Sequence, residues 1–375
     1  MPDEGNPIDR DMMNLALRLA HRGLGNTASN PAVGAVICDE RSGEIIARGW
    51  TQPGGRPHAE SEALRRAADR ARGATMYVTL EPCAHFGKTP PCADAIIAAG
   101  LKRVVIGMED PDARTAGAGI ARLRAAGIDV EVGVQRSEAN WVTRGHGLRM
   151  TQGRPFVTIK IATDATGEIA AGDGTQPVWV TGPHARAAGH LLRARADAIV
   201  IGSGTLRTDN PELTCRLPGL ADRTPVRVVL ASRDPVPLGA RLVQTAGRWP
   251  TWVIRPVGGA DTAELSARGV LVFELPGEPQ GVAIHSALAM LAERGMTRVL
   301  VEGGPTMWRV FAEANLIDEV VVFQAGDVGP LDRARGVVTR YLGDHADVIL
   351  QEHRPVGGDT VWRWRALAAV AVAGA

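Results

Sequence analysis

The chain has 375 residues, of which 45% are hydrophobic, so it is long enough for two or three domains with substantial cores. Its 42 Lys and Arg residues against 41 Asp and Glu leave a formal net charge of +1, which does not favour nucleic acid as a partner. The sequence lacks the apolar run of about 18 residues that a membrane span needs. The acidic start MPDEGNPIDRD does not resemble a signal peptide, so we expect a soluble, cytoplasmic protein.

Hydrophobic periodicity predicts alternating helices and strands in the first part of the chain. Residues 9–21 place Met13, Leu17 and Ala20 on one side of an amphipathic helix. Further along we expect strands at 32–39, 74–80 and 103–108, and helices at 58–72, 92–99 and 119–126. This alternation predicts an α/β layer structure with a largely parallel sheet.

The polar segment 144–155, which contains glycines and a proline, is expected to separate a domain of residues 1–150 from one of residues 151–375. In the second domain we expect strands at 156–162, 178–181, 197–202, 226–231, 251–255, 270–274 and 298–304. Helices are expected at 184–194, 282–295 and 305–315, which makes this domain α/β as well. The Ala/Val/Gly-rich tail after Leu367 is expected to fray.

A cluster of metal-ligating residue types follows the first predicted strands. His58, Cys83 and Cys92 can fill three of zinc's four tetrahedral positions, leaving one for a water molecule. Zinc lowers the pKa of that water toward about 7, and Glu60 can transfer the protons. His-x-Glu followed by Pro-Cys is typical of zinc deaminases. The alternative is a closed structural site with His85 as fourth ligand, in which Glu60 would have no use.

Several longer motifs surround these residues. They are N-P-A-V-G-A-V at 30–36, H-A-E at 58–60 and L-E-P-C-A-H-F-G-K-T-P-P-C at 80–92, with looser matches at 110–112 and 116–120. They resemble the bifunctional deaminase–reductase family of riboflavin biosynthesis, over nearly the whole chain. The resemblance implies a cytidine-deaminase-like first domain and a small pyrimidine substrate that carries a ribosyl phosphate.

In physical terms, Asn30 can bond the ring or sugar of such a substrate, while His85, Lys88 and Thr89 can hold its phosphate side. The alternatives are an Asn-Pro turn at Asn30 and a solvated loop charge at Lys88.

A glycine turn in the second domain suits a phosphorylated cofactor. V-E-G-G-P-T at 301–306 follows a predicted strand and opens a helix, where backbone N–H groups and the helix dipole favour a pyrophosphate. The alternative is a plain tight turn. G-S-G-T-L-R at 202–207 is only a broken dinucleotide fingerprint, because Arg207 stands where the third glycine belongs.

The second domain resembles the reductase half of the same family, in K-I-A at 160–162, W-V-T-G at 179–182, 197–205, 209–216 and E-G-G-P at 302–305. The resemblance implies a dihydrofolate-reductase-like fold that uses NADPH. The cofactor would be lined by Ala162, Trp179, Thr205, Asp209, Ser232, Gly303, Gly304, Pro305 and Thr306, and the substrate by Arg193, Leu213, Arg216 and Glu302. Hydride transfer is expected to depend on Lys160, Asp209 and Glu302, since each follows or ends an apolar strand.

The sequence departs from the family pattern at several positions. Asp164-Ala165-Thr166-Gly167 replaces Ser-Leu-Asp-Gly, and Asp112 stands where Asn is usual. Pro177 replaces Ser, Ala231 replaces Asp, and Ala325-Gly326 replaces Ala-Pro. An alternative is therefore a deaminase whose second domain only binds a ligand or reduces a related pyrimidine.

The main hypothesis is a bifunctional enzyme of riboflavin synthesis that uses Zn²⁺ and NADPH. Its partner would be a small phosphoribosyl pyrimidine, with neither nucleic acid nor membrane involved, and a homo-oligomer is compatible with this. A tRNA or free-nucleoside deaminase is disfavoured by the near-neutral charge, the long insert between the cysteines and the second domain. A zinc-stabilised binding protein without chemistry is disfavoured by Glu60.

Overall fold

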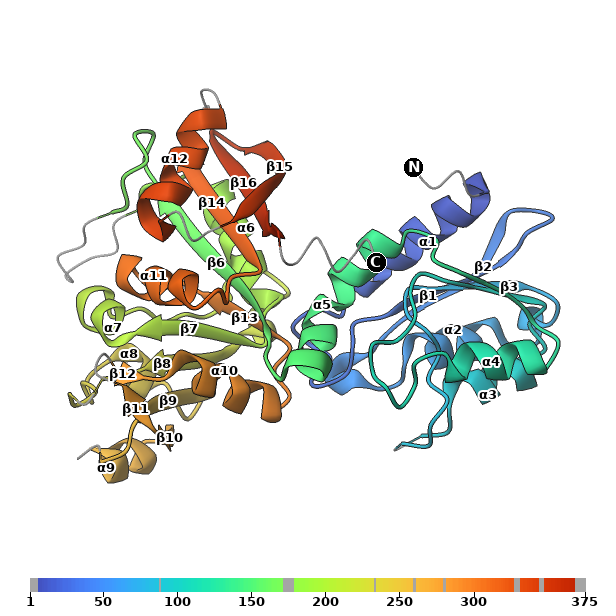
Figure 1. Ribbon diagram of the computed structural model, residues 1–375, viewed down its shortest axis with the longest axis horizontal. Coiled ribbons are helices and arrows are strands. Elements are labelled where there is room, and N and C mark those ends of the chain that lie inside the picture. Colours follow the sequence, from blue (N-terminus) through green and yellow to red (C-terminus); the bar gives the residue numbers. More distant parts are fainter. Residues whose placement is uncertain are drawn as a thin grey trace. The chain divides into compact units, whose positions relative to one another are not determined.

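A computed structural model describes residues 6–87, 89–170, 179–232, 234–258, 261–278, 281–326, 331–343 and 347–367. The expectations for Lys88, for Pro177 and for the tail after Leu367 therefore lie outside the described residues. The chain divides into two compact units, with the boundary between Gly153 and Arg154 (Figure 1).

The first unit is a five-stranded mixed sheet covered by helices (Figure 1). Its helices are α1 (Pro7–Ala20), α2 (Ala59–Ala67), α3 (Cys92–Ala99), α4 (Ala118–Ala125) and α5 (Arg136–Gln152), with short 3₁₀ turns at Pro53–Gly55 and Ala68–Ala71. Its strands are β1 (Gly34–Asp39), β2 (Glu44–Trp50), β3 (Thr75–Val78), β4 (Arg103–Ile106) and β5 (Asp129–Val132). In the order β2-β1-β3-β4-β5, β1 is antiparallel to both neighbours, while β3, β4 and β5 are parallel.

Successive residues of β1 feed two different hydrophobic clusters. Ala35 and Ile37 pack with residues of α2, α3 and α4, whereas Val36 and Cys38 pack with residues of α1 and α5. This alternation is the period of two that a strand imposes on its side chains. The sheet is therefore covered by helices on both faces.

The end of the first unit differs from the prediction. The segment expected to be a polar linker continues as α5 to Gln152. Gly145 and Gly147 weaken a helix locally, but Val142 and Leu148 are buried, so tertiary packing stabilises it. β2 and β5 were not predicted either, because their exposed and polar positions interrupt the apolar pattern.

The second unit is built on a nine-stranded sheet of order β10-β9-β8-β7-β13-β6-β14-β16-β15. Its strands are β6 (Phe156–Thr163), β7 (Ala198–Gly202), β8 (Val226–Leu230), β9 (Thr251–Pro256), β10 (Leu271–Leu275), β13 (Arg298–Val301), β14 (Glu319–Ala325), β15 (Val348–Val356) and β16 (Asp359–Ala366), with a separate pair β11 (Gly277–Glu278) and β12 (Gly281–Val282). Neighbouring strands are parallel from β10 to β14, and β16 is antiparallel to β14 and to β15.

The helices of the second unit cover both faces of this sheet (Figure 1). They are α6 (Pro183–Ala194), α7 (Ser203–Asp209), α8 (Arg241–Gln244), α9 (Thr262–Ala267), α10 (Ile284–Glu293), α11 (Pro305–Glu313) and α12 (Leu331–Leu342), with a 3₁₀ turn at Ala221–Arg223. Residues of α10, α11 and α12 share one hydrophobic cluster, and residues of α6 to α9 share the other.

One expectation for the second unit was wrong. The described residues of the strand expected at 178–181 form no strand, and Trp179 is 59% exposed. The Gly-rich stretch after β7, for which no element was predicted, begins the helix α7 at Ser203. α12 and the strands β14, β15 and β16 were not predicted.

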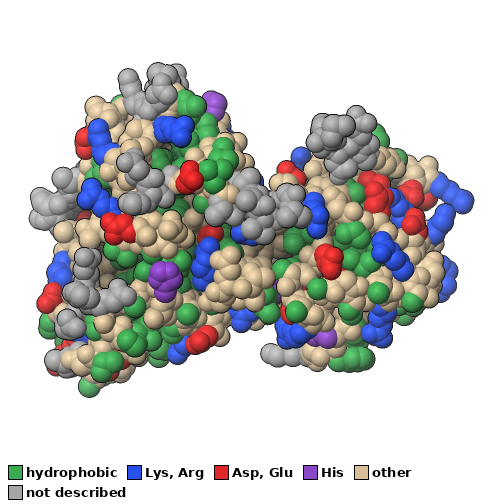
Figure 2. All heavy atoms as spheres, in the orientation of Figure 1, with side chains coloured by type: hydrophobic (Ala, Val, Ile, Leu, Met, Phe, Trp, Pro, Cys, Tyr) green, Lys and Arg blue, Asp and Glu red, His purple; other side chains and the backbone are tan. Residues whose placement is uncertain are grey.

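One face of the molecule carries charges of both signs (Figure 2). On the face in Figure 2, Lys and Arg side chains are interspersed with Asp and Glu over each unit. Among the described helices, none has both the length and the hydrophobicity that a membrane crossing requires.

Candidate active sites

The predicted zinc ligands converge at two helix N-termini of the first unit. His58 is the N-cap of α2, Cys92 is the first residue of α3, and Cys83 follows β3. The His58 Nδ1 atom lies 3.8 Å from Cys83 Sγ and 3.4 Å from Cys92 Sγ. All three ligand atoms lie within 4.8 Å of one another. An imidazole and two thiols at this spacing fit a tetrahedral zinc ion with one open position.

The electrostatics of this group also fit a cation. The backbone N–H of Cys92 donates to Cys83 Sγ at 3.3 Å, and hydrogen bonding to Cys92 lowers the pKa of the Cys83 thiol. The hydrogen bond to Cys83 raises the pKa of His58. A low thiol pKa favours the thiolate, which is the form that binds a metal. His58 Nε2 is buried without a hydrogen-bond partner among the described residues.

Glu60 lies in the first turn of α2, directly beside the ligand group. It is 4% exposed, and burial raises its pKa to about 7. A bound zinc ion would act in the opposite direction, because its charge stabilises the carboxylate. A buried carboxyl poised near neutral pH can both accept and donate a proton.

The described residues that were expected to hold the substrate are Asn30, His85 and Thr89, and the last two lie in the loop between Cys83 and Cys92. A Cβ on Gly55 would lie 2.2 Å from Asn30 Nδ2, which brings Asn30 against the segment leading to His58. His85 Nδ1 is 3.2 Å from Thr115 Oγ1. Arg56, which the sequence analysis missed, donates to Thr89 Oγ1 at 2.5 Å.

Glu81 was noted only as part of a motif, yet its carboxylate ties the turn before Cys83 to the segment 110–120. It is 3% exposed and accepts hydrogen bonds from the backbone N–H groups of Asp110, Gly117, Gly119 and Ile120. A carboxylate that satisfies four backbone donors, three of them buried, fixes this segment relative to the Pro82-Cys83 turn. The sequence did carry one signal for this role, because Glu81 stands immediately before the turn that contains the metal ligand Cys83.

Asp112, which stands where the family has Asn, is paired with Arg114. Both oxygens of its carboxylate accept from Arg114 Nε at 2.9 Å. The hydrogen bonds from Arg114 lower the pKa of Asp112 to about 2. The negative charge that Asp112 adds in place of Asn is therefore balanced by the guanidinium of Arg114.

The second unit has a cavity of about 440 Å³ at the carboxyl ends of its central strands. Of the residues expected there, the cavity is lined by Lys160, Ala162, Trp179, Arg193, Thr205, Asp209, Arg216, Glu302, Gly303, Gly304 and Pro305. Side chains that the sequence analysis missed also line it, among them Arg186, His190, Trp308 and Phe323. Arg186, His190 and Arg193 share one face of α6, so their helical spacing was the available signal.

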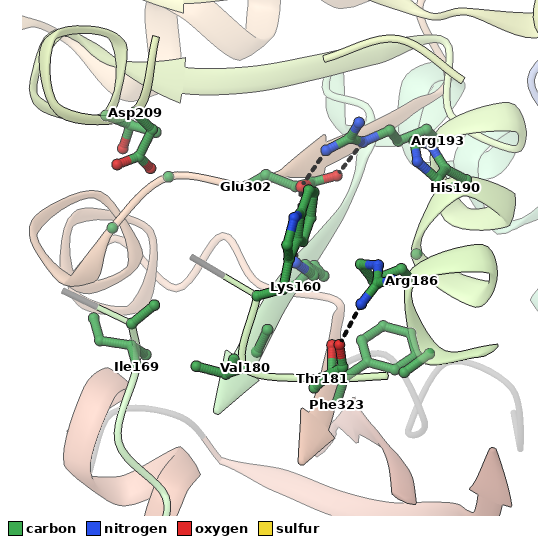
Figure 3. A pocket seen from close by; sticks show the side chains of 18 of the residues that line it. Lys160, Ile169, Val180, Thr181, Arg186, His190, Arg193, Asp209, Glu302 and Phe323 are labelled. Atoms are coloured by element: carbon green, nitrogen blue, oxygen red, sulfur yellow. Dashed lines mark hydrogen bonds and ion pairs between the residues drawn. The ribbon is translucent and has the colours of Figure 1, made fainter. Parts of the chain in front are cut away.

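A buried charge cluster forms one wall of this cavity (Figure 3). Arg193 donates to Glu302 at 2.8 and 2.9 Å, and Lys160 Nζ lies 3.9 Å from the same carboxylate. Burial alone would raise the pKa of Glu302, but the charges of Arg193 and Lys160 outweigh it and lower the pKa to about 2. Burial lowers the pKa of Lys160, and it lowers that of His190 to about 4. In Figure 3, Asp209 lies across the cavity from Arg193 and His190.

A second cavity of about 470 Å³ adjoins the first, since Thr205, Thr208, Gly304 and Pro305 line both. It also contains Ser232 and Thr306, which were expected at the cofactor. Gly304 is the N-cap of α11, so the predicted pyrophosphate turn does open a helix here. Two joined cavities suit an extended ligand such as a dinucleotide beside a smaller one.

Leu213 is the expected substrate residue that the structure does not bring to either cavity. Its side chain is 3% exposed and packs in the hydrophobic cluster beneath α6. Any contact with substrate would therefore have to come from its backbone. Arg193 lines the cavity, but its guanidinium already bonds Glu302 and the carbonyl of Thr214.

The departure from the family pattern at 164–167 forms a turn that contacts Gln324, the residue before the departure at Ala325-Gly326. Asp164 Oδ1 accepts from the N–H and the hydroxyl of Thr166, at 2.8 and 2.7 Å, and so closes the turn after β6. Gln324 Nε2 donates to the carbonyl of Ala165 at 3.3 Å. Gly326 has a φ of +82°, a conformation that the usual proline cannot adopt. None of these residues is among those that line the two cavities.

Ala231 is the departure that does line a cavity. It is 2% exposed and lies in the wall of the second cavity, where the family carries a carboxylate. The wall at this point is therefore apolar.

The chain is similar to known proteins over nearly its whole length. Residues 7–108 match the model of the cytidine and deoxycytidylate deaminase zinc-binding region, and residues 155–328 match that of the RibD C-terminal domain. The riboflavin biosynthesis protein RibD of Aquifex aeolicus is 40% identical over 318 residues, covering 85% of this chain and 87% of the relative. That of Escherichia coli is 39% identical over 366 residues, covering 94% and 97%.

Solved structures give the same result. Acinetobacter baumannii RibD is 32% identical with a TM-score of 0.79, covering 96% of this chain and 98% of that one. A diaminohydroxyphosphoribosylaminopyrimidine deaminase/5-amino-6-(5-phosphoribosylamino)uracil reductase of Thermotoga maritima is 33% identical with a TM-score of 0.81, covering 96% and 99%. The expected fold class, with a cytidine-deaminase-like domain followed by a reductase domain, is confirmed.

Proposed function

The chain belongs to the RibD family of riboflavin-biosynthesis proteins, and we propose that it carries out the family's two reactions with the residues described above. It is a diaminohydroxyphosphoribosylaminopyrimidine deaminase and a 5-amino-6-(5-phosphoribosylamino)uracil reductase. We assign the deaminase to residues 1–150 and the reductase to residues 151–375. The observation that carries the proposal is one chain holding both the His58–Cys83–Cys92 group and the joined cavities.

In the deaminase, His58, Cys83 and Cys92 would hold zinc, which supplies the Lewis acidity that makes water a nucleophile at neutral pH. Glu60 accepts a proton from the attacking water and passes it to the ring nitrogen. It then delivers a proton to the leaving amine, so that water and the amino group are exchanged for a carbonyl and ammonia. Asn30 and the loop with His85 and Thr89 would orient the phosphoribosyl pyrimidine.

In the reductase, NADPH supplies the hydride that converts the ribose into a ribityl chain. The cofactor would extend from the second cavity, at Ser232 and Thr306, into the first. As the hydride reaches the sugar carbon, the bond from that carbon to the ring oxygen breaks, and the oxygen takes up a proton from solvent. Lys160 would stabilise the negative charge on this oxygen, and Asp209 would orient the sugar hydroxyls. Glu302 holds Lys160 and Arg193 in place beside the substrate.

The departures from the family pattern do not argue for an inactive second domain. Among the described residues, the altered turn at 164–167 and Gly326 lie outside the cavity walls. Ala231 changes only one position in the wall of the second cavity, and Lys160, Asp209 and Glu302 are all present. The proposal therefore keeps both activities.

The partners we propose are small molecules only, with a homo-oligomer as the assembly to test by light scattering. We propose a cytoplasmic location, since NADPH and phosphoribosyl intermediates are metabolites of that compartment.

The decisive experiment incubates the purified full chain with the diaminopyrimidine substrate, with and without NADPH. Ammonia and pyridine-nucleotide absorbance are followed separately. We expect ammonia in both reactions, and NADPH oxidation that begins only after deaminated product has formed. Ammonia without any cofactor oxidation would leave the second domain as a binding module, and absence of both signals would refute the assignment.

A further inference from the structure

The C-terminal hairpin formed by β15 and β16 reaches the N-terminus of α6. Asp359, the first residue of β16, accepts a hydrogen bond from the backbone N–H of Gly182 at 2.7 Å. Asp359 is 6% exposed and Gly182 is half-buried, so the contact is partly buried. Gly182 is the N-cap residue of α6.

The hairpin supplies a capping carboxylate that the sequence of α6 lacks. Its N-cap, Gly182, has no side chain to accept from the first N–H groups, and its first turn carries no acidic residue. Helix N-termini are normally stabilised by a capping oxygen and by nearby negative charge. Asp359 brings a carboxylate to this position from a strand more than 170 residues away, as the sequence separation of 177 shows.

The fit between the hairpin and the helix is close. A Cβ on Gly182 would lie 3.0 Å from Asp359 Oδ2, and one on Gly357 would lie 2.7 Å from His184 Nδ1. Gly357 has a φ of +68°, so both space and backbone conformation favour glycine there. Val356 and Val361 pack in the same hydrophobic cluster as residues of α6.

α6 presents one continuous face to the reductase cavity, made of Ala185, Arg186, Gly189, His190 and Arg193. The segment just before the helix, Trp179 to Thr181, also lines the cavity, and Arg186 donates to the Thr181 carbonyl at 2.7 Å (Figure 3). A shift of the helix N-terminus would therefore move the lining on both sides of Gly182. The match to the RibD C-terminal domain ends at residue 328, before this hairpin begins.

We propose that Asp359 is a positioning residue of the reductase, which holds the N-terminus of α6 and the Trp179–Thr181 segment in their productive place. It touches no reacting atom and acts through Gly182. The inference rests on the proposed reductase activity. By this proposal the C-terminal hairpin contributes to the reductase activity and does not only extend the sheet.

The test compares steady-state reduction by the full-length wild type, Asp359→Ala and Asp359→Asn, at a temperature where circular dichroism shows each protein folded. We expect Asp359→Ala to raise the KM for the deaminated substrate about tenfold, which corresponds to about 1.4 kcal/mol. Asp359→Asn should recover to within about threefold, because an amide oxygen can still accept from Gly182. Ammonia release should remain unchanged in both variants. Glu352→Ala, on the exposed side of the same hairpin, is the control that should change neither activity.

The outcomes separate this inference from the function on which it rests. A wild type that oxidises no NADPH contradicts the reductase itself. An active wild type, with Asp359→Ala lowering only the melting temperature, overturns the positioning role alone, as does an Asn variant no better than Ala. Where Asp359→Ala does not fold, Gly182→Ala makes the same test, because its methyl group would press on the Asp359 carboxylate. An unchanged KM in that folded variant would also overturn the inference.

Discussion

Arg193 and Glu302 form a two-pronged ion pair, with hydrogen bonds of 2.8 and 2.9 Å inside the wall of the reductase cavity. Both residues were expected to contact the substrate, and the structure shows that they also bond each other. A planar guanidinium bound in this way has little freedom, because both oxygens of the carboxylate are engaged. The pair therefore acts as one rigid element beside Lys160.

The first prediction concerns Glu302→Gln. It removes the anion that balances two buried cations, Arg193 and Lys160, and such a break costs about 3–5 kcal/mol. Urea unfolding should show this loss of stability, and NADPH oxidation should disappear. Glu313→Gln, at an exposed position of α11, is the control and should change neither. If Glu302→Gln were as stable as the wild type, the ion pairs of Glu302 with Arg193 and Lys160 would not contribute to stability.

The second prediction concerns acid stability of the first unit. Burial alone would raise the pKa of Asp9, but hydrogen bonds from Arg103 and Tyr77 lower it below its ordinary value. A carboxyl with a lowered folded-state pKa stabilises the protein above its unfolded pKa of about 3.9, and this is lost as pH falls through the folded value. Asp9→Asn should therefore flatten the fall in unfolding free energy below about pH 4.

The control for Asp9 is Asp11→Asn on the same helix, where the carboxyl is exposed. It should keep the wild-type dependence of stability on pH. Equal acid dependence in wild type and Asp9→Asn would assign the acid transition to other carboxyl groups.

The sequence predicted the zinc group well because its ligands lie in short motifs at element boundaries. The cofactor turn at 301–306 was found for the same reason. Arg186 was missed although it lies one and two helical turns from His190 and Arg193 on the expected helix, whereas Phe323 was missed because only the fold brings it to the cavity. Phe323 is carried to the cavity by β14, where it pairs with Ala162 of β6.

The missed elements have different causes. β15 is largely exposed, so no regular hydrophobic alternation marks it. α7 begins with Ser203 and Gly204, which favour a loop on local propensity alone. β14 is different, since its run of buried apolar residues was a readable strand signal. The role of Asp359 had no local signal, because its partner Gly182 is 177 residues away in sequence.

The third prediction is one zinc ion per chain, held by His58, Cys83 and Cys92. Metal analysis of Cys83→Ser and Cys92→Ser should show a large loss of zinc, because a hydroxyl is a much poorer zinc ligand than a thiolate. Cys215→Ser, buried in the second unit, is the matched control and should keep its zinc. Full zinc content in both of the first two variants would refute the ligand assignment.

The fourth prediction is that Glu60→Gln keeps its zinc but loses deamination by at least about 100-fold, the lower range for removal of an acid–base group. The amide keeps the size of the side chain, which is 4% exposed, and removes its ability to carry a proton. Glu62→Gln is the neighbouring control, since that carboxylate pairs with Arg65 and Arg66. Burial raises the pKa of Glu60 and bound zinc lowers it, and the base must be ionised, so wild-type ammonia release should fall as the pH drops through the pKa that results from both effects. This acid limb should be absent from the residual activity of Glu60→Gln, whereas NADPH oxidation with already deaminated substrate should be normal. Near-normal ammonia release from a zinc-loaded Glu60→Gln protein would show that Glu60 only supports the structure and that another group transfers the proton.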